Sequence, residues 1–523
     1  MKTLSCAVGL LIAAAAAWAQ TAPVSDEIRS LRQELSAQRL VIQQQSREID
    51  ELKQAVKQLA VESHAGGVPA SAMSTPAAAS TSATSEGRSA QITTDTRSAA
   101  EEKASPLTVR IGGMEFDPGG FLDLTSSFRS TNVGSGIGTS FGTIPFPNTA
   151  AGHLTELRLS AQNSRLSLKI TGTRANTQLT GYVETDFGGV QPNNVFVTTN
   201  STTLRMRLFW ADVYHGKWEV MGGQSWSWLN PNRSGVSPMP ADIFFTQNMD
   251  TNYQVGLTWT RAPQFRVVYH ASPRWAMGVA LEGPEQYIGS NVALPASVSS
   301  AYASQLNTGS LSNTPNLHPD IIPKVAWDKD VDGRHLHLEA VGLLRSFKVF
   351  NPSSGVSSVE TGGGGSVNAN LEVLRNFRII MNTFYSDGGG RYIFGLGPDV
   401  VVRPGGTLSL VHSGSGIGGL EYQIHSTLLS AYYGGTYFQK NFFLDPTTKT
   451  YVGYGFPGSP SNRMLEEATV GMTQTIWKNK NYGALQLLLQ YSFLKRSLWS
   501  PAAGQPADAH SHLWYTDLRY ILP

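Results

Sequence analysis

The residues best suited to chemistry lie between positions 328 and 339, in the stretch DKDVDGRHLHLE. Asp328, Asp330, Asp332, Gly333 and Glu339 match the calcium-loop pattern D-x-D-x-D-G-x5-E at every required position. In such loops carboxylates supply oxygen ligands, the glycine permits a sharp turn, and the last glutamate completes the coordination shell. The motif therefore raises the hypothesis of a calcium site.

The flanking residues argue against that calcium site. Calcium loops of this type lie between helices and curl back on themselves. Here IIPKVAW alternates as a strand before the stretch, and His335, His337 and Glu339 alternate with Leu336 and Leu338 after it. In an extended strand the glutamate would lie about 20 Å from the glycine, too far to complete a shell. We interpret the stretch as a hairpin turn and predict no metal site, leaving open weak ion binding by the three aspartates.

The remaining chemical motifs do not indicate an enzyme. GSGIGG, which begins at Gly414, is followed by a strand rather than the helix that a dinucleotide fingerprint requires. The sequence shows no serine elbow, no zinc-ligand spacing and no convincing carboxylate pair. We therefore predict a protein without catalytic activity and without a cofactor.

The first 19 residues have the pattern of a signal peptide. Lys2 precedes an apolar run, and Ala17-Trp18-Ala19 places small residues where signal peptidase requires them. A membrane anchor is a weaker alternative because the run is short for a span of about 20 residues. Cleavage after Ala19 would remove Cys6, the only cysteine, which excludes disulfides and cysteine sites from the exported chain. The balance of 40 Lys+Arg and 38 Asp+Glu indicates no nucleic-acid partner.

Residues 25–62 are predicted to form a parallel coiled coil. Apolar residues recur with heptad spacing, and the charges at the flanking positions attract neighbouring parallel chains. The predicted core consists of Ile28, Leu31, Leu35, Ile42, Ile49, Leu52, Val56 and Leu59. Gln38 and Gln45 interrupt this core and can fix its register. An ordinary amphipathic helix packed on a domain is the alternative, and the heptads do not decide between two and three strands.

Residues 63–106 are predicted to be a flexible, disordered linker. They are rich in Ala, Ser, Thr, Gly and Pro and nearly free of large apolar side chains, so they cannot bury enough surface to offset their ordering entropy. The rest of the chain, residues 107–523, forms a separate unit.

That unit is predicted to be an all-β transmembrane barrel of about 16 antiparallel strands. Short segments alternate strictly between apolar and polar residues, as strands between lipid and water do. Examples are SRLSLKITG, QLTGYVETDF, YQVGLTW and ALQLLLQYSF. Trp218, Trp259 and Trp327 fall on predicted lipid-facing sides near short turns, the depth that amphipathic rings favour.

The predicted connections alternate between short and long, which fits a barrel with both ends on one side of the membrane. The short turns fall near 174–177, 215–217, 262–264, 328–333, 376, 425–426 and 479–481. The long loops fall near 131–153, 188–202, 227–249, 283–319, 347–365, 388–415, 439–460 and 497–509.

The order of signal peptide, heptad segment, linker and barrel resembles the DcaP-like trimeric outer-membrane porins, a general-porin-like family with an N-terminal coiled coil. The local similarities are NSRLSLKITG at Asn163, VMGGQSWSWLNP at Val220, GVALEGPE at Gly278 and GLLRSF at Gly342. The resemblance implies a passive, trimeric diffusion channel with its stalk in the periplasm and a preference for small organic anions such as dicarboxylates. It also implies that the third long loop, 227–249, folds inward and constricts the pore with Arg233 and Asp242.

The strand alternation predicts which charged residues face the lumen. The basic candidates are Arg165, Lys169, Arg205, Arg207, Arg266, Arg345 and Arg519, and the acidic candidates are Glu184, Asp186, Glu339 and Asp517. An excess of fixed positive charge in a narrow pore raises the local concentration of anions. We therefore expect a modest anion preference, although mixed charge is also what an ordinary wet lumen contains.

Two functions fit this organisation. The first is an outer-membrane porin for small hydrophilic solutes, with the bilayer and copies of itself, as a homotrimer, as partners. The alternative is an envelope anchor or spacer whose periplasmic coiled coil, about 48 Å long at 1.5 Å per residue, binds a periplasmic or cell-wall component. A surface adhesin has only the length of the loops to support it.

Overall fold

The computed structural model describes residues 105–523, except 190–202, 290 and 310–313. The predicted signal peptide, the coiled coil with its core residues, and nearly all of the predicted linker lie outside the described residues. They stay predictions.

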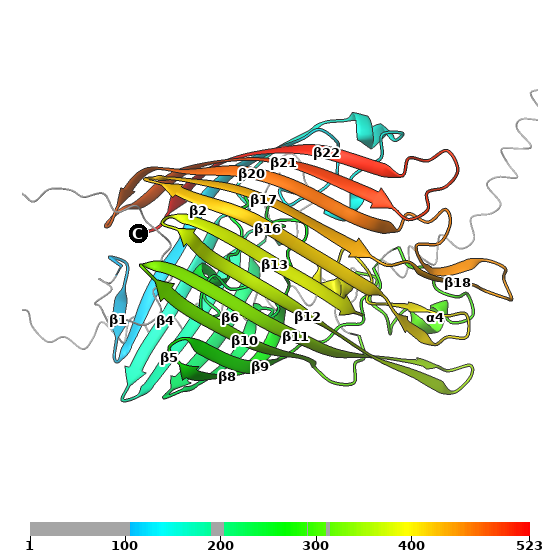
Figure 1. The fold of residues 1–523 in the computed structure, drawn as a ribbon, viewed down its shortest axis with the longest axis horizontal. Coiled ribbons are helices and arrows are strands. Elements are labelled where there is room, and N and C mark those ends of the chain that lie inside the picture. The colour runs from blue at the N-terminus through cyan, green and yellow to red at the C-terminus, as the bar shows by residue number, and fades with distance from the viewer. Residues whose placement is uncertain (1–104, 190–202, 290, 310–313) are drawn as a thin grey trace, which may run out of the picture. The chain divides into compact units, whose positions relative to one another are not determined.

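The described residues form a closed antiparallel β-barrel with sixteen strand positions in its wall (Figure 1). The sheet contains eighteen strands, but β3 and β4 both pair with β2 as one interrupted strand, and β1 (Val109–Ile111) is only a short hairpin arm on β2. Pairing of β2 with β22, from Phe121 opposite Ile521 to Arg129 opposite Leu513, closes the ring. The predicted barrel is thereby confirmed.

The wall strands are β2 (Met114–Arg129), β3 (Glu156–Ser160) with β4 (Arg165–Arg174), β5 (Thr177–Asp186), β6 (Arg205–His215), β7 (Trp218–Trp226), β8 (Arg261–Ser272), β9 (Trp275–Glu282), β10 (Asp320–Val331), β11 (Arg334–Asn351), β12 (Val356–Leu374), β13 (Phe377–Asp387), β16 (His412–Ile424), β17 (Thr427–Phe438), β20 (Asn462–Asn479), β21 (Gly483–Leu498) and β22 (Asp508–Ile521).

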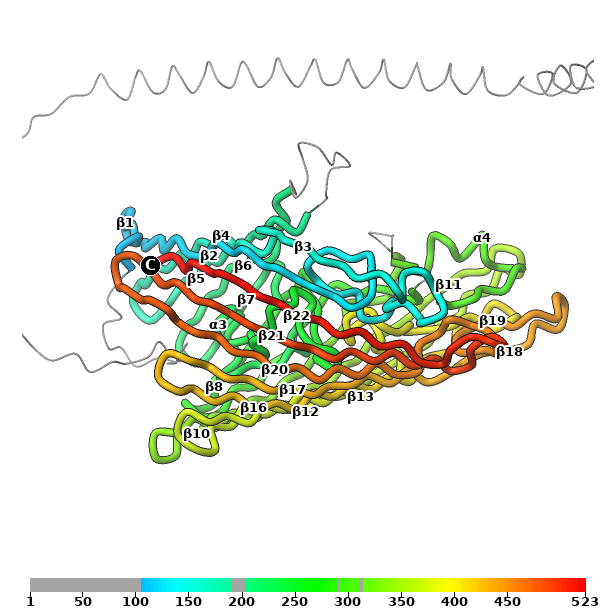
Figure 2. The backbone as a smooth tube through the Cα atoms, turned by 90° about the horizontal axis from the view of Figure 1, so that it is seen from above, coloured from blue at the N-terminus to red at the C-terminus, as the bar shows by residue number. Residues whose placement is uncertain are grey.

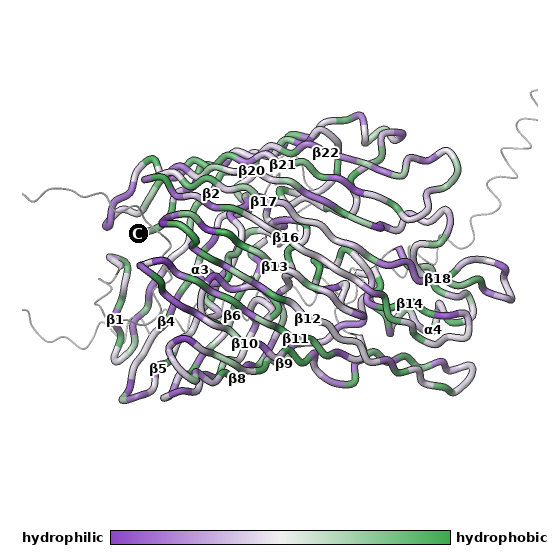
Figure 3. Tube along the Cα trace, viewed as in Figure 1, coloured by the Kyte–Doolittle hydropathy of each residue, from purple (hydrophilic) through white to green (hydrophobic). Residues whose placement is uncertain are grey.

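Hydrophilic and hydrophobic residues alternate along many of the wall strands (Figure 3). On β2, Leu122 and Leu124 are exposed on the outside, while Asp123 and Thr125, which alternate with them, are buried inside. This alternation removes apolar side chains from water only if lipid surrounds the barrel. None of the helices among the described residues is long and apolar enough to span a bilayer.

The short turns gather at one end of the barrel, beside the C-terminus and β1, and the long loops at the other (Figures 1 and 2). Six of the seven predicted short turns are confirmed. The turn near 328–333 is one of them, because β10 and β11 pair across Asp332 and Gly333, which have positive φ angles of 52° and 73°. Glu339 lies along β11 opposite Ala326, so the calcium-loop geometry is not formed.

Two predicted connections are wrong. Positions 262–264 lie inside β8, and the short turn is at Pro273 and Arg274. Residues 347–365 are mostly paired strand, because β11 and β12 extend until Asn351 pairs with Val356. The glycine run 362–365 has the composition of a loop, but a Cβ on Gly364 would stand only 2.6 Å from the carbonyl oxygen of Tyr385 on the next strand. These glycines permit close strand packing.

The segment YQVGLTW is not a wall strand, contrary to the prediction. It lies in the connection between β7 and β8, where Val255 and Leu257 are buried inside the barrel. Trp259 is therefore not at the lipid boundary, and its ring stacks on Phe394 at 4.5 Å. Trp218 does lie on the outside near a short turn, 54% exposed.

The long loops carry small elements of their own. These are η1 (Phe141–Thr143), η2 (Ala150–His153), α3 (Pro240–Ile243), α4 (Ser299–Tyr302), η3 (Gly390–Tyr392), the β14–β15 hairpin (Val400–Val402 and Leu408–Leu410) and the β18–β19 hairpin (Asn441–Leu444 and Tyr451–Tyr454). Tyr302, Val400 and Leu408 pack with Phe347 of β11 in one buried apolar cluster. The loops at this end therefore pack against one another and against the wall.

Candidate functional site: the lumen and its inward loop

Residues 227–260, which join β7 to β8 and which we call the inward loop, lie inside the barrel and bond to the opposite wall. Arg233 donates to both carboxylate oxygens of Glu421 on β16 at 2.7 and 2.8 Å. The carboxylate of Asp250 accepts a hydrogen bond from Tyr515 of β22 at 2.6 Å. The amide of Val255 donates to Glu467 of β20. Buried charge-assisted bonds of this kind hold the loop firmly.

Arg233 also fixes the shape of the inward loop. Its guanidinium donates to the carbonyl oxygens of Phe244 and Phe245, and its amide donates to the carbonyl of Asp242 at 2.6 Å. Both candidate constriction residues therefore meet, but at the backbone of Asp242 rather than at its carboxyl. Arg233 therefore stabilises the conformation of the inward loop.

Asp242 lies in α3, half-buried. Burial raises the pKa of its carboxyl to about 6, with Asp328 adding to this, while a hydrogen bond from Ser237 and the charges of Lys169 and His337 lower it. The carboxyl therefore changes charge near neutral pH.

Five of the predicted lumen residues form one largely buried ion-pair cluster. Arg207 bonds to Glu184 at 2.5 Å and to Asp186 at 2.8 Å. Arg205 bonds to Asp186 at 2.7 Å, and Arg165 lies 3.9 Å from Glu184. Most of this positive charge is therefore compensated.

The other predicted arginines differ in their surroundings. Arg345 is fully buried near the long-loop end, between Asp320 at 3.4 Å and Asp399 at 2.9 Å. Arg266 is also buried and donates to the carbonyl of Trp226. Strand alternation predicts that all these side chains point inward, but it does not reveal which ones the loops cover.

Arg519 and the two remaining acidic candidates also have partners. Arg519 bonds to Asp517 at 2.7 Å and to Asp123 at 2.9 Å. Glu339 is buried and bonds to Lys324 at 3.0 Å. These pairs likewise reduce the net charge that a solute in the lumen would meet.

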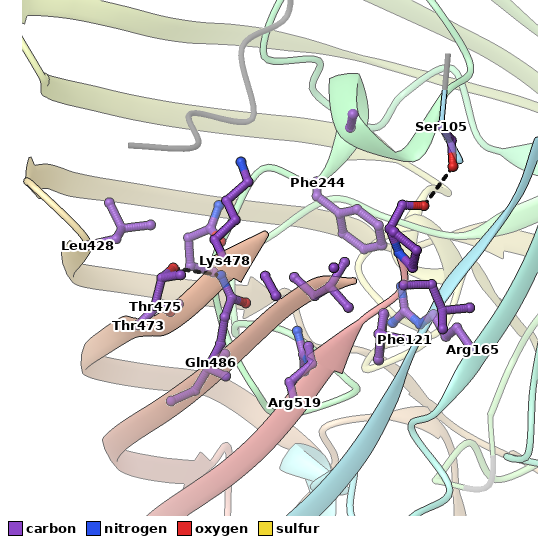
Figure 4. A pocket seen from close by; sticks show the side chains of 18 of the residues that line it. Ser105, Phe121, Arg165, Phe244, Leu428, Thr473, Thr475, Lys478, Gln486 and Arg519 are labelled. Atoms are coloured by element: carbon purple, nitrogen blue, oxygen red, sulfur yellow. Dashed lines mark hydrogen bonds between the residues drawn. The ribbon is translucent and has the colours of Figure 1, made fainter. Parts of the chain in front are cut away.

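A cavity of about 1460 Å³ remains between the inward loop and the short-turn end (Figure 4). Its lining has eight basic and four acidic side chains: Arg110, Arg165, Lys169, Arg233, Arg378, Lys478, Lys480 and Arg519 against Glu115, Asp117, Asp250 and Glu421. Figure 4 shows Lys478 and Gln486 on one wall and Arg165 with Phe121 on another. Among the residues that the structure describes, Lys169, Lys478 and Lys480 line the cavity without a carboxylate within 4.0 Å.

Sequence reasoning missed four of these cations. Arg378 could have been found, because Phe377 and Ile379 beside it have the outward pattern and place it inward. Lys478 and Lys480 could not, because a register shift between Thr475 and Trp477 breaks the alternation before the turn. The fourth, Arg110, belongs to the short hairpin arm β1, which strand counting does not detect.

The fold and this cavity together define a β-barrel with the architecture of outer-membrane channels, in which an inward loop narrows a polar lumen. No protein-family model matches the sequence, and a search of the curated proteins finds no match. Among solved structures, the barrel is similar to the outer-membrane channel DcaP of Acinetobacter baumannii, with a TM-score of 0.56 and 15% identity over 78% of this chain and 98% of that one. The predicted DcaP-like resemblance is confirmed at the level of fold.

More distant similarities include an anion-selective porin from Comamonas acidovorans, with a TM-score of 0.45 and 11% identity over 78% of this chain and 100% of that one. Another is Salmonella typhi OmpF in complex with daunomycin, with a TM-score of 0.44 and 11% identity over 79% and 100% of the two chains.

Proposed function

We propose that this protein is an outer-membrane porin that lets small hydrophilic solutes diffuse passively. The observation that carries the proposal is the closed sixteen-strand barrel with an apolar exterior, a polar interior and a cavity of about 1460 Å³ inside it. A barrel that served only to fill the membrane would not need a charged, hollow interior. In this orientation the short-turn end faces the periplasm.

We further propose that the channel favours small organic anions, such as dicarboxylates. The support is the excess of basic over acidic side chains around the cavity, and above all Lys169, Lys478 and Lys480. Fixed positive charge in a narrow, low-dielectric passage raises the local anion concentration. The arginines in ion pairs contribute less, because their carboxylate partners cancel much of their field.

The test is the reversal potential of the detergent-purified protein in a planar bilayer under a KCl gradient. We expect anion selectivity in the unaltered protein and a shift toward cations in the triple variant Lys169→Ser, Lys478→Ser, Lys480→Ser. The control is Lys449→Ser, because Lys449 lies in the β18–β19 turn at the other end of the barrel and does not line the cavity. An unchanged reversal potential in the triple variant would overturn the anion proposal.

The alternative is a barrel that anchors a periplasmic stalk. The contacts of the inward loop favour it, because the loop reaches the walls formed by β13 through Thr258, by β17 through Gln247 and by β21 through Met249, besides those already described. Such a loop leaves little room for a wide pore. A silent bilayer despite verified insertion would favour the anchor over the channel.

A further inference from the structure

The histidines of the stretch DKDVDGRHLHLE face one of its aspartates. His337 Nδ1 lies 2.7 Å from Asp328 Oδ1, and His335 Nε2 lies 3.1 Å from the same oxygen. The three side chains come from both strands of the β10–β11 hairpin, which places position 328 opposite position 337. One carboxylate oxygen and two imidazole nitrogens all lie within 4.8 Å of one another.

These separations suit a single tetrahedral metal ion. With metal–ligand bonds of about 2.0–2.1 Å, neighbouring ligand atoms of a tetrahedral site stand about 3.3 Å apart. The two measured distances from Asp328 Oδ1 differ from that value by a few tenths of an ångström, so small side-chain rotations suffice. The strand register, rather than a flexible loop, holds the three ligands together.

Each imidazole also has a second carboxylate near the ring nitrogen that points away from Asp328. The nitrogen of His335 that points away from Asp328 lies 3.0 Å from Asp330 Oδ1. The corresponding nitrogen of His337 lies 3.3 Å from Glu339 Oε1. A histidine that binds a metal usually gives its other N–H to a carboxylate, which fixes the ring and raises its basicity. His335 has this arrangement, which is a feature independent of the cluster itself, whereas His337 Nε2 lies near Glu339 without making a hydrogen bond.

The ligand types select the class of metal. Two imidazoles and one carboxylate suit Zn²⁺ and related transition-metal ions, whereas Ca²⁺ and Mg²⁺ require oxygen ligands in larger number. His337 is fully buried, but the side chains of Asp328 and His335 keep 19% and 20% of their exposure, so an ion can reach the site. Water would occupy the fourth position.

We propose that Asp328, His335 and His337 form a transition-metal site of the Zn²⁺ class at the short-turn end of the barrel. The same Asp328 oxygen accepts a hydrogen bond from the amide of Gly235 in the inward loop at 3.1 Å. A bound ion would therefore lie beside a hydrogen bond that joins the barrel wall to the inward loop. The calcium-like motif thus has a binding role, but through its histidines and for a different metal.

The test is titration of the detergent-solubilised full-length protein, purified without a histidine tag, with Co²⁺. The readout is the visible d–d absorption of the ion, followed by displacement with Zn²⁺. We expect one Co²⁺ per chain with the intense absorption of a four-coordinate site. Loss of an outer-shell partner of a metal ligand costs about 10–100-fold in affinity, so Asp328→Asn and His335→Ala, which remove ligands, should weaken binding at least as much.

The matched control is His215→Ala. His215 lies at the β6–β7 turn, at the same end of the barrel, and its Nδ1 bonds to Thr177 rather than to a carboxylate. We expect it to bind Co²⁺ like the unaltered protein. Absence of Co²⁺ binding by the folded barrel, or equal binding by His335→Ala and His215→Ala, would overturn the proposal. Because both ligand variants change partly exposed side chains, the test does not depend on replacing the buried His337.

Discussion

Arg207 shows how a lumen charge can stabilise the barrel rather than attract a solute. Its guanidinium is buried and shared between Glu184 and Asp186. A buried carboxylate left without its partner is strongly destabilising, because neither water nor a counter-charge replaces the lost bonds. The position was predicted as pore-lining, and its burial indicates that its main effect is on stability.

We therefore expect Arg207→Ser to lower the free energy of unfolding by about 3–5 kcal/mol. The measurement is urea-induced unfolding of the detergent-solubilised barrel, followed by tryptophan fluorescence. Arg110→Ser is the control, because Arg110 pairs with Glu115 at 2.7 Å with both side chains exposed, where a pair contributes about 0–1 kcal/mol. Equal losses in the two variants would contradict the buried-cluster interpretation.

At the scale of elements, the inward loop depends on side-chain bonds more than on regular structure. Its helix α3 has only four residues, and Arg233 alone makes four of the ordering bonds, two to Glu421 and one each to the carbonyls of Phe244 and Phe245. We expect Arg233→Ala to release the loop and to give larger and noisier single-channel currents in a planar bilayer. Arg274→Ala, in the exposed β8–β9 turn, should leave the currents unchanged; if it alters them equally, the loop is not what limits the current.

If the barrel conducts ions as proposed, the same loop should make its selectivity sensitive to pH. Burial raises the pKa of Asp242 to about 6, so its carboxylate is lost as the pH falls from about 7 to about 5. The lumen then becomes more positive, and anion selectivity should increase. The discriminating variant is Asp242→Asn, which should remove the shift in reversal potential that the aspartate causes.

The raised pKa of Asp242 also makes the stability of the folded protein depend on pH. Because the folded-state pKa lies above the ordinary value near 3.9, the folded protein binds the proton more tightly than the unfolded chain between about pH 4 and 6. The contribution of Asp242 to stability therefore decreases as the pH rises through this window. Thermal unfolding of Asp242→Asn should lack this component, and an identical pH profile in both proteins would contradict it.

The elements of the wall were predictable because lipid and water impose opposite demands on alternate residues of each strand. SRLSLKITG satisfies both demands, and Leu166 is exposed outside while Lys169 lines the cavity inside. YQVGLTW has the same alternation for another reason, since its buried side chains pack against the inner wall and not against lipid. Alternation of apolar and polar residues along a strand shows that its two faces meet different environments. It does not show that one of these environments is lipid.

For the whole molecule, the sequence indicates which residues face inward but not which of them meet water. Arg345 and Lys169 have equivalent positions in the strand pattern. Arg345 is buried beneath packed loops, whereas Lys169 lines the cavity. The difference arises from contacts between segments far apart in the chain, such as the bond from Arg345 to the carbonyl of Gly388. Strand periodicity carries no information about such contacts.

The assembly of several copies is the remaining prediction at this scale. If the heptads of residues 25–62 bind three chains together, channels should open in groups of three equal steps. Leu35→Asp with Leu52→Asp places charges in the predicted coiled-coil core and should abolish the grouping, because a buried charge without a partner opposes association.

The control for this prediction is Gln33→Asp with Gln54→Asp, because both residues occupy the outer position f of the heptad repeat and should tolerate a charge. The measurement is single-channel recording together with the mass of the protein–detergent complex. Groups of three steps that persist in the core variant would show that the barrels associate without the stalk. The heptads would then serve a partner other than the protein's own copies, as the anchor alternative requires.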